Sequence, residues 1–185
     1  SSFHCIVDHM TYSESGFSFS KGGNPLGGRL GADRTIVVSA PLTRGEAGTV
    51  AEQLTMLDAE SDAPIRVVMS SVMGGNVDAG VSVYDLIRSL TAPVTMLGSG
   101  GIVGAGVLAF VGAPRAPRFA LPHARFRFEE PRAIREEGPA RDFETAAEES
   151  EEQRGRIVSL IAAVTGQSEA QVEADLEAQR TFDAD

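Results

Sequence analysis

The chain has few of the residues that crosslink proteins, bind metals or span membranes. It contains one cysteine, Cys5, three histidines and no tryptophan in 185 residues. A single cysteine excludes an internal disulfide framework and fits a reducing compartment. The histidines and the cysteine lack the spacing of metal ligands, and no apolar run is long enough to cross a bilayer. We therefore expect no disulfide, metal, cofactor or membrane partner.

Basic residues are also scarce. The chain has 16 Lys and Arg against 26 Asp and Glu, which gives a formal net charge of −10. Nucleic-acid binding needs clustered Lys and Arg, so we expect no nucleic-acid partner. Much of the acid falls in residues 144–152, which we interpret as a solvated helix face, with a charge-matched neighbouring subunit as the alternative. Residues 1–12 lack the basic start and apolar block of a signal peptide, and this favours the cytoplasm.

The composition changes near residue 33. Residues 4–12 and 17–20 predict two short strands around a turn, and residues 21–31 form a glycine-rich linker with one proline. The remaining length fits one domain that buries a sizeable core. We therefore predict an N-terminal hairpin with a flexible segment in residues 1–33, with a disordered terminus as the alternative, followed by one domain in residues 34–185.

Local patterns indicate where helices begin in this domain. Thr43 with Glu46 has the form of a capping box, as does Ser168 with Gln171. Asp78 is the expected cap of the helix between these two. The expected strands are at residues 35–39, 65–69, 94–97, 118–121 and 125–129. Strands and helices that alternate at this spacing predict an α/β fold of βαβ units with a mostly parallel sheet.

Three motifs identify a family resemblance. The segments are A-G-V-S-V-Y-D at residues 79–85, A-L-P-H-A-R at residues 120–125 and T-G-Q-S at residues 165–168. Together they resemble the proteolytic subunit of the ATP-dependent Clp protease (ClpP), over roughly residues 34–182. The resemblance implies a spiral of βαβ units, which crotonases share, with a protruding handle helix at about residues 132–156. In that family the handle joins two heptameric rings, and the N-terminal hairpin lines an axial pore.

The resemblance also locates the family's Ser-His-Asp triad, and none of its members is present. The matching positions hold Gly104, Glu129 and Gln179. A glycine has no group that can attack a carbonyl, and an amide cannot stabilise an imidazolium. We therefore predict a degenerate, inactive member of the family. Its oxyanion-hole positions are the backbone N–H groups of Gly75 and Ala105, and we expect the Glu129 carboxylate to face this corner.

The family docks a hexameric ATPase through apolar surface pockets. The residues that match those pockets are Val67, Met69, Leu97, Phe119 and Leu121. For Val67 and Leu97 the alternative is an ordinary place in the strand core. The expected partners are thus ClpP-type heptameric rings, an active paralogue of this chain and an ATPase of this kind.

Two other functions stay open at this point. An active serine endopeptidase would need relocated groups, and the candidates are Ser70, Ser71 and Ser99 at strand ends, with His123 as the base. A crotonase-like enzyme would act on an acyl-thioester with Glu129 as the acid or base. The motifs at residues 79–85 and 120–125 favour the Clp family over the crotonases.

Overall fold

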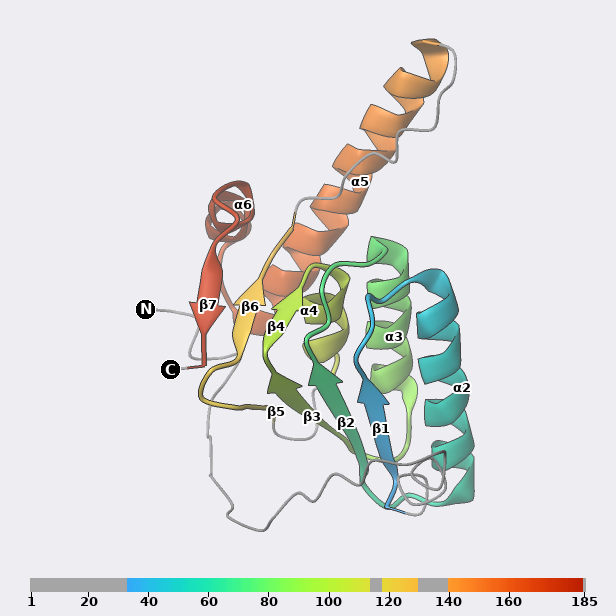
Figure 1. Ribbon diagram of the computed structural model, residues 1–185. Helices are drawn as coiled ribbons and strands as arrows, with labels where there is room; N and C mark the ends of the chain where they lie inside the picture. Colours follow the sequence, from blue (N-terminus) through green and yellow to red (C-terminus); the bar gives the residue numbers. More distant parts are fainter. Residues whose placement is uncertain (1–32, 114–117, 130–139, 185) are drawn as a thin grey trace.

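The computed structural model describes residues 33–113, 118–129 and 140–184, and Figure 1 shows their arrangement. The predicted N-terminal hairpin and residues 130–139 of the predicted handle lie outside these ranges. The elements are β1 (Thr35–Val38), α2 (Arg44–Glu60), β2 (Ile65–Ser70), α3 (Val77–Ser89), β3 (Val94–Ser99), β4 (Gly101–Val103), α4 (Ala105–Phe110), β5 (Arg118–Ala120), β6 (Arg125–Arg127), α5 (Ala140–Thr165), α6 (Glu169–Glu177) and β7 (Thr181–Asp183).

The strands form two sheets. The larger sheet has the order β1-β2-β3-β5 and is parallel throughout, while the smaller sheet has the order β4-β6-β7. In the smaller sheet β4 and β6 are parallel, and β6 and β7 are antiparallel. Figure 1 shows α2, α3 and α4 on one face of the larger sheet, and the first turns of α5, in orange, extending beyond the other elements. The predicted α/β class and the protruding helix are confirmed.

Two of the three predicted helix caps form as expected. The Thr43 hydroxyl accepts a hydrogen bond from the Glu46 N–H at 3.2 Å, and the Ser168 hydroxyl accepts one from the Gln171 N–H at 3.3 Å. The third prediction, Asp78, is wrong. Asn76 caps α3 instead, because its side-chain oxygen accepts from the Ala79 N–H at 3.0 Å, and Asp78 lies inside the first turn. A residue three positions before the bonded N–H satisfies the helix end better than one inside it.

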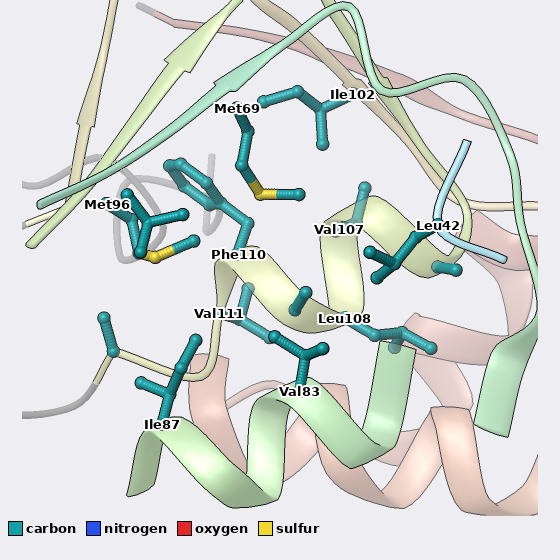
Figure 2. Close-up of a cluster of buried hydrophobic side chains, with 14 of the residues drawn as sticks. Leu42, Met69, Val83, Ile87, Met96, Ile102, Val107, Leu108, Phe110 and Val111 are labelled. Carbon is teal, nitrogen blue, oxygen red and sulfur yellow. The ribbon is translucent and has the colours of Figure 1, made fainter. Parts of the chain in front are cut away.

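The short helix α4 lies at the centre of the core. All six of its residues are buried. Figure 2 shows Phe110 between Met69 and Met96, with Val83 and Ile87 of α3 on the opposite side of α4. The ring of Phe110 also packs against that of Phe126 in β6, with 4.8 Å between centroids. Each such side chain contributes roughly 1.5–3 kcal/mol by leaving water, so packing fixes the position of α4.

A glycine in the first family motif allows α3 to approach α4 closely. A Cβ atom on Gly80 would lie 2.6 Å from the backbone oxygen of Ala105. No larger residue fits this gap without moving one helix. The requirement for glycine at this place therefore comes from helix packing, and it holds the start of α4 against α3.

The second half of α5 is fixed to the domain by apolar and charged contacts. Arg154 pairs with Glu177 of α6 at 2.8 Å, and Arg156 pairs with Asp78 of α3 at 3.3 Å. Three of its side chains enter the core, namely Ile157, Val158 and Ile161. The end of the handle helix is therefore anchored to the domain that carries the candidate site.

Candidate functional site

Gly104 lies at the sharp turn between β4 and α4. Its φ is +57° and its ψ is −118°, a left-handed conformation that costs an ordinary residue energy and glycine almost none. Its N–H donates to the carbonyl of Arg127 in β6 at 3.0 Å, and its own carbonyl accepts from the Val107 N–H at 3.0 Å. The backbone of the expected nucleophile position is therefore held at both ends.

The Glu129 side chain reaches the same turn from the end of β6. A Cβ atom on Gly104 would lie 3.3 Å from Oε2 of Glu129 and 3.6 Å from its Cβ. A Cβ on Gly74 would lie 3.7 Å from the same Oε2. The structure thus brings the expected nucleophile and base positions together, with a carboxylate oxygen beside the place of the missing side chain.

The Glu129 carboxylate is held by Arg127, a residue that the sequence analysis missed. Arg127 Nη2 donates to Glu129 Oε1 at 3.2 Å, and the two side chains are 38% and 29% exposed. The carboxylate faces the corner as expected, but among the described residues its hydrogen bond goes to Arg127 and not to the N–H groups of Gly75 or Ala105. The sequence could have pointed to Arg127, because it lies two residues before Glu129 and side chains two residues apart on a strand lie on the same face of the sheet.

The paired glycines beside this corner have a clear structural role. Gly74 and Gly75 have φ values of +75° and +128°, and a Cβ on Gly75 would lie 2.5 Å from the backbone oxygen of Leu42. That oxygen accepts from the Asn76 N–H at 3.0 Å, so the loop is fastened to the segment between β1 and α2. Their use as an oxyanion cradle stays a prediction.

Gln179, the third expected position, follows α6 and precedes β7. Its φ is +47°, and its N–H donates to the carbonyl of Leu176 at 3.0 Å. In the antiparallel β6–β7 pair, Thr181 lies opposite Arg127. Gln179 comes two residues before Thr181, in the turn that leads into β7. The topology therefore gathers all three positions at one end of the smaller sheet.

The candidate relocated nucleophiles do not form a pair with a base. Ser70 and Ser99 are neighbours across β2 and β3, and the Ser71 N–H donates to the Ser99 carbonyl at 2.9 Å. His123 lies in the turn between β5 and β6. Within the described ranges, no hydrogen bond links His123 to a serine.

The predicted ATPase-docking residues divide between the two faces of the larger sheet. Val67 and Met69 are 2% and 1% exposed and point into the core, so they offer no surface for docking. Leu97 and Phe119 lie side by side on the opposite face and are partly buried, and Leu121 is 43% exposed. The neighbour of Leu97 in β2 is Val68. Val67 and Met69 therefore lie in the strand core, which is the alternative that the sequence offered for Val67, and docking stays a prediction for Leu97, Phe119 and Leu121.

Two further expectations can be compared with the structure. In the part of the chain that the structure describes, no helix is long and apolar enough to traverse a bilayer. In the same part, no three His, Cys, Asp or Glu residues gather as a metal ion would require.

Taken together, these features define a class of fold. The parallel sheet of βαβ units, the short buried helix α4 and the long protruding helix α5 form a fold that solved structures of ClpP share. The chain superposes on ClpP1 from Listeria monocytogenes with a TM-score of 0.73 and 29% identity, over 85% of this chain and 87% of that one.

Relatives with similar sequences agree with this class. The "ATP-dependent Clp protease proteolytic subunit 3" of Rhizobium etli is 35% identical over 147 residues, which are 77% of this chain and 75% of the relative. Subunit 2 of the same protease in Pseudomonas aeruginosa is 33% identical over 144 residues, 78% of this chain and 71% of the relative. The family model described as Clp protease matches residues 23–185. The chain belongs to the Clp protease family.

Proposed function

We propose that this chain is a non-catalytic subunit of a Clp protease complex in the cytoplasm, where it acts in the assembly or regulation of ATP-dependent proteolysis. The observation that carries the proposal is Gly104 at the nucleophile position, with the Glu129 carboxylate directly beside it. A serine peptidase needs a hydroxyl nucleophile, a base that removes its proton and a group that orients the base. The three positions here hold a glycine, a carboxylate and an amide.

The expected loss of activity is large. Removing a single triad member from a serine peptidase lowers kcat by roughly 10⁴- to 10⁶-fold, and the losses do not add because the triad acts as a unit. In this chain the first member is absent altogether, so no acyl-enzyme can form at residue 104. The absence of a hydrogen bond between His123 and Ser70, Ser71 or Ser99 in the described residues supports the proposal that no relocated serine replaces it.

The partner in this proposal is an active paralogue. The names of the relatives, ATP-dependent Clp protease proteolytic subunits, support a role in a proteolytic ring. We infer that the chain enters heptameric rings with such a paralogue and that a hexameric ATPase feeds the mixed particle. The charged sequence of the handle, with its acidic run at residues 144–152, supports pairing with a specific partner ring.

The test combines activity with native mass. Three samples are compared, namely the chain, the active ClpP of the same cell and their mixture. Peptidase activity is measured with a fluorogenic peptide, and the mass of each particle is measured by native mass spectrometry. We expect the chain alone to be inert and the mixture to form a particle of altered activity.

A fluorophosphonate probe is the control for a hidden nucleophile, and it should label the active paralogue alone. Peptide hydrolysis or probe labelling by the isolated chain would contradict the loss of catalysis. A homogeneous particle of this chain that does not incorporate the paralogue would contradict the mixed complex.

A further inference from the structure

The position of one carboxylate oxygen suggests more than the loss of a base. Oε2 of Glu129 lies 3.3 Å from the place where a side chain on residue 104 would begin, and 3.7 Å from the matching place on Gly74. Both neighbours are glycines, so no other side chain separates this oxygen from the turn. In a serine peptidase the nucleophile, the base that activates it and the carbonyl group that it attacks meet at this place.

Arg127 holds the carboxylate in this space through its side chain and holds the turn through its backbone. Its other oxygen, Oε1, accepts a hydrogen bond from Arg127 at 3.2 Å, which leaves Oε2 directed at the glycines. The backbone carbonyl of Arg127 accepts from the Gly104 N–H at 3.0 Å. Phe128, between the two charged residues, is 3% exposed and anchors the strand in the core. One residue, Arg127, therefore positions both the carboxylate and the turn.

A carboxylate at this place has two effects on a peptide ligand. It fills volume that a substrate carbonyl would enter. It also places negative charge beside an electron-rich carbonyl oxygen, which repels it, whereas a working centre offers hydrogen-bond donors to that oxygen. Both effects oppose binding, and the first would remain if the charge were removed.

We propose that Glu129 is a built-in block of the peptide-binding centre, held in place by Arg127, so that a backbone carbonyl cannot enter the corner beside Gly104. The block rests on the proposed function of a non-catalytic subunit. It prevents this subunit from binding peptides, whereas an unblocked subunit would bind them without cleaving them. Peptides delivered to a mixed particle then reach the active subunits alone.

Peptide affinity tests the block on the isolated chain. The probe is a fluorescein-labelled unstructured ten-residue peptide, and its binding is followed by fluorescence anisotropy. Glu129→Ala removes volume and charge together, and we expect it to raise affinity at least tenfold. Glu129→Gln removes the charge and keeps the volume, and we expect a smaller rise. Arg127→Met frees the carboxylate to move, and a rise between the wild-type and Glu129→Ala values is expected.

The matched controls are Glu52→Ala and Glu52→Gln, which change an exposed acid on α2. They should leave affinity unchanged. Circular dichroism and native mass confirm that each variant folds, and Glu129→Ser replaces Glu129→Ala where that variant does not. Wild-type chain that already binds the peptide as tightly as its Glu129→Ala or Glu129→Ser variant would overturn the block. That result leaves assembly with a paralogue untouched, so the failure of the block is distinct from failure of the proposed function.

Discussion

Two regions border the candidate site and are held in different ways. One is the buried turn from β4 into α4, and the other is the exposed edge formed by the charged residues of β6 and β7, which we call the strip. The turn is fixed by packing, with all six residues of α4 buried and Gly80 tight against Ala105. The strip carries half-exposed charges, and its ion pairs are Arg125 with Asp183 and Arg127 with Glu129. From this difference we expect the scaffold of the site to depend on the core, and changes of the exposed charged side chains to cost little stability.

The largest expected effect comes from the core side of this comparison. Phe110→Ala empties the space between Met69 and Met96, and we expect a loss of about 3–5 kcal/mol in the free energy of unfolding. Urea denaturation measures this loss. Met56→Ala, at a site that is 65% exposed, is the control and should change the midpoint little. Equal losses for the two variants would mean that α4 is not the centre of the core.

The turn itself should show an intermediate effect. Gly104→Ala puts a side chain at a φ of +57°, and we expect a loss of roughly 1–3 kcal/mol in the free energy of unfolding. Part of that loss should disappear in the double variant with Glu129→Ala, because the new Cβ meets Oε2 at 3.3 Å. Gly155→Ala is the control, since no atom lies near its Cβ and the helix should gain about 0.5–1 kcal/mol. Additive losses from residues 104 and 129 would refute their contact.

The smallest effect belongs to the strip. Arg125 and Asp183 form an ion pair at 3.3 Å, with side chains that are 70% and 64% exposed. Such pairs contribute about 0–1 kcal/mol, and salt screens them. Arg125→Met should therefore lower stability by less than this upper value, and the difference should shrink at high salt. A loss as large as that of Phe110→Ala would remove the contrast between the two regions.

Local chemistry explains which features the sequence could predict. The caps Thr43 and Ser168 depend on residues three positions apart, so short patterns reveal them. The strand β4 was missed because its surroundings, from Gly98 to Gly101, have the composition of a loop. The strand β7 has three residues and forms only through its pairing with β6.

The arrangement of the candidate site could not be predicted from local sequence patterns, because it depends on contacts between residues that are far apart in the sequence. The family motifs located Gly104 and Glu129, but their approach is set by the parallel pairing of β4 with β6, which no local pattern encodes. The burial of Val67 and Met69 depends on the same sheet. Side chains on a strand alternate between faces, so the packing of β2 decides which of its residues enter the core.

The conformation of residue 104 also bears on which substitutions the site can accept. A serine at this position meets a backbone with a φ of +57° and a carboxylate 3.3 Å from the new Cβ. A histidine at position 129 finds no hydroxyl to activate. We therefore expect serine alone at position 104 to lower stability without completing a triad, and histidine alone at position 129 to bring no activity. The two positions are coupled through this turn, so a working centre would require changes at both together.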